Sequence, residues 1–290
     1  MSTQFDTLVF ERDIAASPGA VWHAWIDPAA RAAWSAPSPA VTVEYLSADA
    51  RVGGEEISLC KVKGQPDIRC DIRWLAMDPG LRSVNSEVIA QEGTTLSTAL
   101  VTAELRGMGE GCVLTLTVQL ASLAEDMGVG YQQGFGAGLD NLTDVAQRVL
   151  SIERVIDAPV AALWEAWTDP EALPLWWGPD GFSCRTQRID LRKGGEWVFD
   201  MVGPDGTVYP NHHRYTRHIP QTRIDYTLHW GENGPKHADA SARFEPMGKR
   251  TKVTLDMLMA TQDDYDQAKA MGAMELGLQT LGKLARQVGA

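Results

Sequence analysis

The stretch WEAWTDPEALPLWWGP at residues 164–179 has a copy earlier in the chain, WHAWIDPAARAAWSAP at residues 22–37. The two align without a gap at an offset of 142 residues, so that three tryptophans and one Asp-Pro pair match. An internal repeat has to be recognised before local structure is assigned, because it determines how the whole chain is divided. The 290 residues are therefore predicted to form two copies of one fold.

The repeat continues beyond these stretches. The Gly-Gly-Glu triplet at 53–55 matches the triplet at 194–196 at an offset of 141, and a Gly-Leu pair at 138–139 matches one at 277–278 at an offset of 139. Small changes of offset at loops are expected between divergent copies of one fold. We place the domains at residues 1–149 and 150–290 with almost no linker, so the two are expected to pack at a fixed angle as a pseudo-dimer.

Both copies show the same order of predicted elements. A strand (about 6–15 and about 151–157) leads to a short helix, and an Asp-Pro pair begins a second one. About six segments of alternating polarity follow, separated by turns such as Gly-Pro-Asp-Gly at 203–206, which is typical of an antiparallel meander.

The last segment of each copy is predicted to be helical. In the second copy, apolar residues at helical spacing indicate one long helix over about 262–288. In the first copy, the corresponding segment carries five glycines between residues 128 and 138. Each interior glycine costs about 1 kcal/mol relative to alanine. We therefore expect the helix of the first copy to be weakly formed or broken at its start.

Four motifs in residues 151–288 carry a family resemblance: the W-x-x-W-T-D-P-E opening, WWGPDGF at 176–182, DLRKGGEW at 190–197 and GPDGTVYPN at 203–211. On these motifs the second copy resembles the bacterial branch of the Aha1 C-terminal-like proteins (activator of Hsp90 ATPase homologues) in the SRPBCC, or START-like helix-grip, superfamily. Residues 8–148 resemble the family more weakly, through the repeat. They lack the GPDGTVYPN motif and carry Ser35 where the second copy has Trp177.

The resemblance implies a fold class and a kind of site. The fold is α+β, with two tandem helix-grip (START-like) domains, each a curved antiparallel sheet with two short helices and a long C-terminal helix. An elongated, mostly apolar cavity is expected between sheet and helix, and such a concave apolar space is a small-ligand site by default. The lost motif and the glycine-rich helix make the first copy the expected scaffold and the second copy the expected ligand site.

Composition and charge limit the partners, the compartment and the cofactors that we expect for the protein. The net charge is −12, and residues 1–150 hold 10 Lys and Arg against 19 Asp and Glu, which disfavours nucleic acid and anionic membranes as partners. The sequence has no basic leader and no long apolar run. Its four cysteines form no C-x-x-C pair, which argues against a disulfide framework or a zinc site. We expect a cytoplasmic protein with reduced thiols, no metal and no cofactor.

Three functions are compatible with these features. The leading hypothesis is a binding protein for an apolar or aromatic small molecule, because no Gly-x-Ser-x-Gly, phosphate loop or zinc spacing is present. The resemblance suggests a second, an activator of an Hsp90 ATPase or another interaction module with a chaperone partner. The third is a cyclase or hydrolase acting on a polyketide-like substrate, with cavity histidines or Tyr215 in acid–base roles; enzymatic activity is the less favoured hypothesis.

The candidate cavity residues all lie in the second copy. Alternation along a strand places His213, Tyr215 and Arg217 on one face, and Trp177 is the one tryptophan of 164–179 without a match in the first copy. Methionines adapt to ligands of varied shape. The full set of candidates is Trp177, Trp197, Phe199, His213, Tyr215, Arg217, Tyr226, Met271 and Met274.

Overall fold

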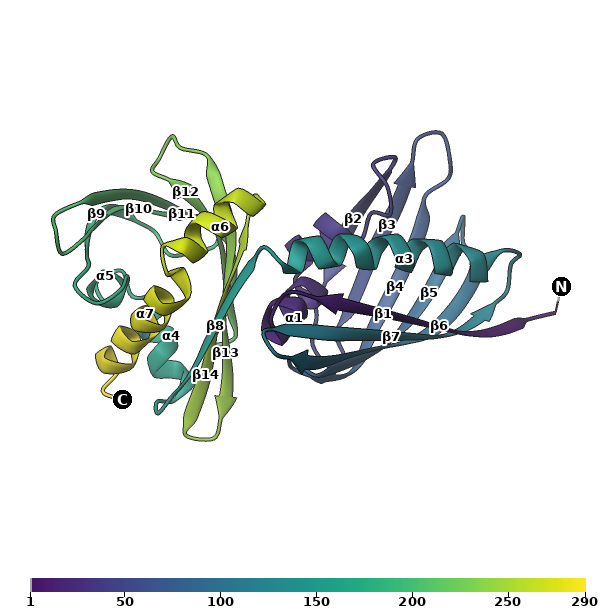
Figure 1. The fold of residues 1–290 in the computed structure, drawn as a ribbon, viewed down its shortest axis with the longest axis horizontal. Coiled ribbons are helices and arrows are strands. Elements are labelled where there is room, and N and C mark those ends of the chain that lie inside the picture. The colour runs from purple at the N-terminus through teal and green to yellow at the C-terminus, as the bar shows by residue number, and fades with distance from the viewer. Residues whose placement is uncertain (1) are drawn as a thin grey trace. The chain divides into compact units, whose positions relative to one another are not determined.

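The computed structural model describes residues 2–290 and divides after Gln147 into two compact units, which we call the first and the second unit. Figure 1 shows that each unit consists of a curved sheet with a helix lying across one face. Each sheet has seven strands, and every strand pairs antiparallel with its neighbours. The predicted α+β class with tandem copies of one fold is confirmed.

The described residues of the first unit, 2–147, form seven strands and three helices. Its strand order is β1-β7-β6-β5-β4-β3-β2, so the first strand joins the last one and the others form a meander. The elements are β1 (Gln4–Ile14), α1 (Pro18–Ile26), α2 (Pro28–Trp34), β2 (Val41–Ala48), β3 (Glu55–Val62), β4 (Ile68–Asp78), β5 (Arg82–Gln91), β6 (Thr94–Met108), β7 (Gly111–Ser122) and α3 (Met127–Ala146).

The second unit repeats this topology, with strand order β8-β14-β13-β12-β11-β10-β9. It differs mainly in its last segment, which forms two helices. The elements are β8 (Val149–Ile156), α4 (Val160–Thr168), α5 (Leu173–Trp176), β9 (Ser183–Ile189), β10 (Glu196–Val202), β11 (Val208–Ile219), β12 (Arg223–Trp230), β13 (Lys236–Met247), β14 (Arg250–Met259), α6 (Gln262–Ala270) and α7 (Ala273–Gln287).

In the first unit the Asp-Pro pair starts a helix, as predicted. In the second unit the helix begins a few residues after the pair. Asp27 is the N-cap of α2, and its carboxylate accepts hydrogen bonds from two backbone N–H groups of the first turn. Asp169 accepts only the N–H of Glu171, and α5 begins later, at Leu173. The second short helix of the second unit is therefore a single turn.

The tryptophan at the end of this helix makes the same bond in both units. The indole Nε1 of Trp34 donates to the carbonyl of Ala24 over 2.7 Å, and that of Trp176 donates to the carbonyl of Ala166 over 2.9 Å. Both rings are buried. The matched tryptophans thus bond the second short helix to the first in both units. This shared contact explains why both copies carry a tryptophan at this position.

The prediction for the glycine-rich helix is wrong. α3 is continuous from Met127 to Ala146. Its buried face includes Tyr131, Leu139 and Leu142, and Gly138 lies against the ring of Trp34. Most helical stability in proteins comes from packing an apolar face, and here that packing outweighs the low helix propensity of glycine.

The prediction of one long helix over 262–288 is also wrong. α6 ends at Ala270, and Gly272 has φ +77° before α7 begins. Glycine adopts this left-handed conformation without the steric cost that a Cβ imposes. Gly272 is therefore the sequence signal for the break.

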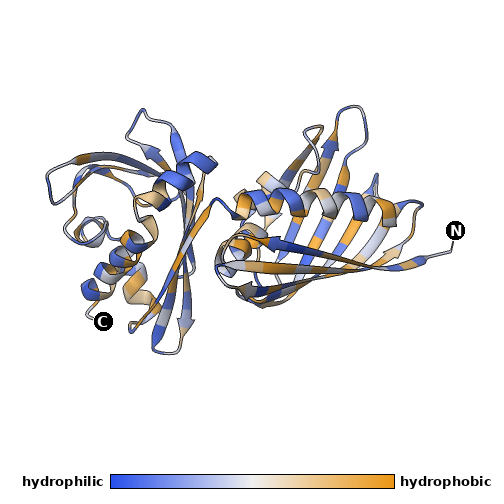
Figure 2. Cartoon of the chain, in the orientation of Figure 1, coloured by the Kyte–Doolittle hydropathy of each residue, from blue (hydrophilic) through white to orange (hydrophobic). Residues whose placement is uncertain are grey.

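Polarity alternates along the strands of both sheets, which Figure 2 shows as blue and orange bands. This pattern gives each sheet one face that contributes to the core of its unit. Among residues 2–290, no helix combines the length and the apolar character that crossing a bilayer requires.

Candidate functional site

The sheet of the second unit presents aromatic side chains on the face that contributes to the core. Three adjacent strands supply them: Trp197 of β10 is paired with His213 of β11, and Tyr215 of β11 is paired with Tyr226 of β12. Trp177 reaches them from the residue after α5. We call Trp177, Trp197, Phe199, His213, Tyr215 and Tyr226 the inner-face cluster; all six side chains are buried.

The rings of the inner-face cluster contact one another. The Trp177 ring centroid lies 6.0 Å from Trp197, 5.4 Å from His213 and 6.3 Å from Tyr226. His213 stacks on Tyr226 at 5.0 Å. Six of the nine predicted candidates are thus brought together. Trp177 also contacts Trp167 of α4, with 5.7 Å between the ring centroids, so it joins the cluster to that helix.

Three members of the cluster carry polar side-chain atoms. They are the imidazole of His213 and the hydroxyls of Tyr215 and Tyr226. An imidazole and a phenol can each donate or accept a hydrogen bond, so these three groups are the polar part of the cluster.

Burial keeps these groups uncharged. It lowers the pKa of His213 to about 3, with a further contribution from the neighbouring histidines. It raises the pKa of the Tyr215 and Tyr226 hydroxyls well above their usual range. At neutral pH the cluster thus offers one neutral imidazole and two neutral phenols, which can orient a ligand without adding charge.

The neutral state of His213 predicts acid sensitivity. Its folded-state pKa of about 3 lies below the unfolded value of about 6.5. The unfolded chain therefore takes up the proton first, and stability is lost as pH falls from 6.5 toward 3. At pH 5 this loss is about 2 kcal/mol. We expect the fall in unfolding free energy between pH 7 and pH 5, measured by urea denaturation, to be smaller by this amount in His213→Phe. An equal fall in both proteins would contradict the assignment.

Arg217 does not belong to the cluster, and its predicted place is wrong. A bulge interrupts the pairing of β11 with β12, so that Tyr215 pairs with Tyr226 while Arg217 pairs with Asp225. The extra residue reverses the alternation. Arg217 forms an ion pair with Asp225, with 3.3 Å between Nε and Oδ2. It is a salt-bridge residue on the opposite face of the sheet.

His218 takes the inner position that the alternation rule assigned to Arg217. Its ring lies 5.4 Å from that of Trp164 and 6.0 Å from that of Tyr215. The sequence gives no direct signal for this placement, because the position of a bulge depends on pairing with another strand.

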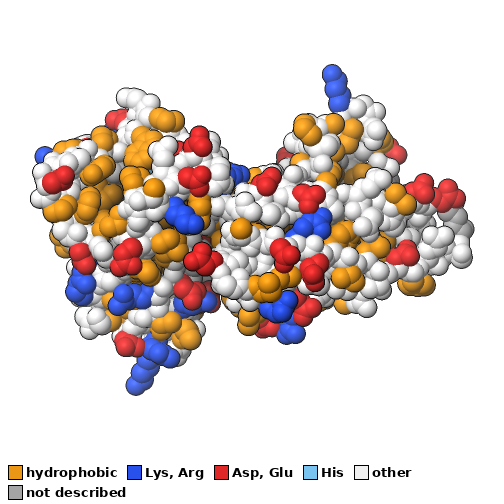
Figure 3. Space-filling model, in the orientation of Figure 1, with side chains coloured by type: hydrophobic (Ala, Val, Ile, Leu, Met, Phe, Trp, Pro, Cys, Tyr) orange, Lys and Arg blue, Asp and Glu red, His pale blue; other side chains and the backbone are white. Residues whose placement is uncertain are grey.

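Met271 and Met274 do not line a buried cavity, so these two predictions are also wrong. Their exposed fractions are 64% and 39%, because the helix breaks at Gly272 between them. Nearby apolar side chains that pack on the core, Met257 and Tyr265 among them, are half-buried. Figure 3 shows apolar side chains gathering on the second unit between α6 and strands β9–β11.

Backbone hydrogen bonds align the two sheets residue by residue. In the first unit Gly53 N–H donates to Trp74 O and Trp74 N–H to Gly54 O; in the second, the glycine pair at 194–195 makes the same two bonds with Tyr215. Trp74 therefore occupies the position of Tyr215. Counting along the paired strands, the first unit has Glu56, Ser58, Ile72 and Asn85 where the second has Trp197, Phe199, His213 and Tyr226. The inner-face cluster has no aromatic counterpart in the first unit except Trp74.

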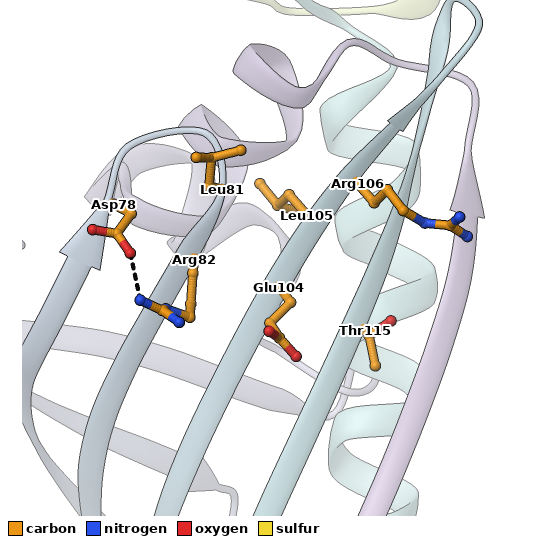
Figure 4. A pocket seen from close by; sticks show the side chains of 7 residues that line it. All are labelled: Asp78, Leu81, Arg82, Glu104, Leu105, Arg106 and Thr115. Carbon is orange, nitrogen blue, oxygen red and sulfur yellow. Dashed lines mark hydrogen bonds and ion pairs between the residues drawn. The ribbon is translucent and has the colours of Figure 1, made fainter.

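A surface pocket of about 460 Å³ lies in the first unit at the turn between β4 and β5 (Figure 4). Asp78 and Arg82 face each other there across 2.7 Å, and both are half exposed. Exposed pairs of this kind contribute little free energy. The remaining lining residues are Leu81, Glu104, Leu105, Arg106 and Thr115.

Over the part that the structure describes, no group of three or more His, Cys, Asp or Glu side chains is arranged to hold a metal ion. The buried imidazole and phenols of the inner-face cluster can instead donate and accept hydrogen bonds.

Two copies of a seven-stranded sheet crossed by a helix define a class of duplicated α+β proteins. The chain belongs to the family described as activator of Hsp90 ATPase homolog 1-like protein, which matches residues 15–147 and again residues 157–289. The resemblance seen in the sequence is thereby confirmed for both copies. No curated protein matches the chain.

Solved structures resemble one half of the chain each. A protein from Rhizobium loti is 33% identical over 49% of this chain and 98% of its own length, with a TM-score of 0.45. A protein from Arthrobacter aurescens is 24% identical over 50% of this chain and 88% of its own, with a TM-score of 0.47. One from Nitrosomonas europaea is 25% identical over 50% and 96%, with a TM-score of 0.44.

Proposed function

We propose that the chain is a small-molecule binding protein whose second unit takes an aromatic, largely apolar ligand carrying one polar group. The observation that carries this proposal is the inner-face cluster itself, in which buried aromatic rings surround the polar side chains of His213, Tyr215 and Tyr226. Ligand sites combine apolar and aromatic walls with a few placed polar groups that fix orientation. The inner-face cluster has this composition.

The break between α6 and α7 supports an entrance at that end of the unit. α6 has no fully buried residue, whereas the second half of α7 buries Leu281, Leu284 and Ala285. The end near Gly272 is therefore the more weakly packed one.

Binding is favoured over catalysis by the state of the polar groups. Burial holds His213 neutral with its pKa at about 3, far from the value near neutrality that suits a general base. The phenols remain protonated because burial raises their pKa. These groups recognise a ligand better than they transfer its protons, which argues against the cyclase or hydrolase hypothesis.

A cytoplasmic location is part of the proposal. All four cysteines are free, and two of them, Cys70 and Cys112, are buried. Burial raises the pKa of Cys184 to about 12, which keeps that half-buried group a thiol. Unpaired thiols are typical of proteins from a reducing compartment.

We expect 2-naphthol to bind with one site per chain and Tyr226→Phe to weaken its binding about two- to tenfold. The substitution removes only the hydroxyl, and a hydrogen bond contributes about 0.5–1.5 kcal/mol. Naphthalene, which has no hydroxyl, should bind wild type and variant equally. Isothermal titration calorimetry measures both ligands.

The matched control is Tyr209→Phe, which removes an exposed hydroxyl from β11 of the same unit. It should leave both affinities unchanged. Absence of 2-naphthol binding, or the same loss for naphthalene as for 2-naphthol, would rule out the proposed role of the phenols.

Activation of a chaperone ATPase is the second candidate, and the family description is what favours it. It predicts that the full chain raises the ATP turnover of a purified bacterial Hsp90. Turnover that stays at its basal rate over a hundredfold range of the chain would remove this candidate without affecting the ligand proposal.

A further inference from the structure

The interior of the first unit contains an ion pair that the second unit lacks. Arg31 of α2 and Glu56 of β3 are both buried, with 3.5 Å between Nη2 and Oε2. The aligned positions in the second unit hold Leu173 and Trp197. Burying a charge is costly unless it is paired, so this pair is a specific feature of the first unit.

Arg31 is held in place by its own contacts. Its Nε donates to the Tyr45 hydroxyl over 3.1 Å, and Nη1 donates to the backbone carbonyl of Trp25 over 3.3 Å. The guanidinium carbon also lies 5.6–5.9 Å from four aromatic ring centroids, those of Trp25, Trp34, Tyr45 and Trp74. Such cation–π contacts fix the cation in a desolvated setting.

Unlike Arg31, Glu56 and Trp74 have buried polar atoms that lack hydrogen-bond partners among the described residues. Both carboxylate oxygens of Glu56 and the indole Nε1 of Trp74 are buried without a hydrogen-bond partner in residues 2–290. Glu56 is opposite Ile72 across the β3–β4 pairing, and Trp74 is two residues farther along the same face. A strong acceptor and a donor therefore lie at diagonal positions on two adjacent strands of the same face. Leaving such groups buried without a partner is unfavourable.

The second buried carboxyl of this interior is already partnered. Glu87 accepts a hydrogen bond from the Tyr131 hydroxyl of α3 over 2.7 Å. Burial raises the pKa of Glu87, which favours its neutral form. Since Arg31 and Glu56 balance each other, a neutral ligand would leave the interior without excess charge.

We propose that the first unit binds a small neutral molecule with a primary carboxamide or an equivalent N–H and C=O edge. The ligand N–H groups donate to the carboxylate oxygens of Glu56, and its carbonyl oxygen accepts from Trp74 Nε1. The second unit has neither group at the aligned positions, so the two copies are specific for different ligand chemistries. The first unit is then a second binding site rather than a scaffold.

The test is a titration of the full ¹⁵N-labelled chain with acetamide and benzamide, followed through the Trp74 indole N–H resonance. Trp74→Phe identifies that resonance among those of the ten tryptophans. We expect a saturable shift of this resonance with at least one of the two amides. We expect acetamide to bind at least tenfold more tightly than methyl acetate, whose ester group has no N–H donor. The reason is that a site built to hydrogen-bond an N–H rejects an analogue without it.

Two variants distinguish a loss of ligand recognition from a loss of folded structure. Glu56→Gln keeps the shape of the side chain and is expected to weaken carboxamide binding at least tenfold, while 2-naphthol affinity stays unchanged. Tyr226→Phe, in the second unit, should leave carboxamide binding unchanged. No shift of the Trp74 resonance with either amide, as when water alone occupies the site, would overturn the proposal. Equal affinities for acetamide and methyl acetate would also overturn it, without depending on any variant.

Discussion

Replacing Arg31 by leucine is expected to destabilise the first unit by about 3–5 kcal/mol. The substitution removes the cation beside Glu56 and leaves that carboxylate buried, with both oxygens lacking hydrogen bonds. Leucine itself suits the position, since Leu173 occupies the aligned site in the second unit and is buried there. The loss would therefore come from the unpaired charge rather than from the shape of the new side chain. Chemical denaturation followed by circular dichroism measures it.

The control is the double variant Arg31→Leu/Glu56→Leu. Exchanging a whole buried ion pair for well-packed apolar residues is often neutral, because no uncompensated charge remains. We expect the double variant to recover most of the stability that Arg31→Leu loses. A double variant as unstable as the single one would show that the aromatic contacts of Arg31, and not the charge of Glu56, account for the effect.

Replacing Trp176 by alanine is expected to destabilise the second unit by about 3–5 kcal/mol. The Trp176 ring is buried, with centroids 4.9 Å from Trp167 and 5.5 Å from Trp177, and its Nε1 bonds the carbonyl of Ala166. Alanine removes these contacts and leaves a cavity that the surrounding rings can fill only in part. The same change at Trp34 should have a similar effect on the first unit.

Two comparisons make this prediction specific. Trp176→Phe keeps an aromatic ring and loses the N–H bond, so it should cost clearly less than alanine. Trp230→Ala removes an exposed indole of the same unit and is expected to cost less than about 1 kcal/mol. Thermal unfolding gives all the values; a similar loss in Trp176→Ala and Trp230→Ala would contradict the anchoring role.

The repeat accounts for most of what could be predicted about the fold. Matched tryptophans and Asp-Pro pairs report local structure, and the strands follow from alternation within each segment. The wrong predictions concern features that depend on residues far away in the sequence. α3 persists despite its glycines because its apolar face packs in the core, and Arg217 turns away because β12 imposes a bulge on β11. Neither effect is local to the sequence.

The residues of the inner-face cluster could be singled out from the sequence, whereas the buried pair Arg31 and Glu56 of the first unit was not. Trp197, Tyr215 and Tyr226 are large aromatic residues on alternating strands, which indicates a buried face. Glu56 lies in a segment whose charged residues suggest solvent exposure, and Arg31 lies in a short alanine-rich helix. The available signal was the repeat itself, since Glu56 aligns with Trp197 once the Gly-Gly-Glu triplets are superposed.

The central claim is that an aromatic ligand binds inside the second unit against the inner-face cluster. Intermolecular nuclear Overhauser effects between unlabelled 2-naphthol and ¹³C-labelled protein test it most directly. We predict contacts from the ligand to the ring protons of Trp177 and Tyr226, in a complex with one ligand in the second unit. Contacts confined to exposed apolar side chains such as Leu175 and Met271 would contradict the claim and place the ligand on the surface.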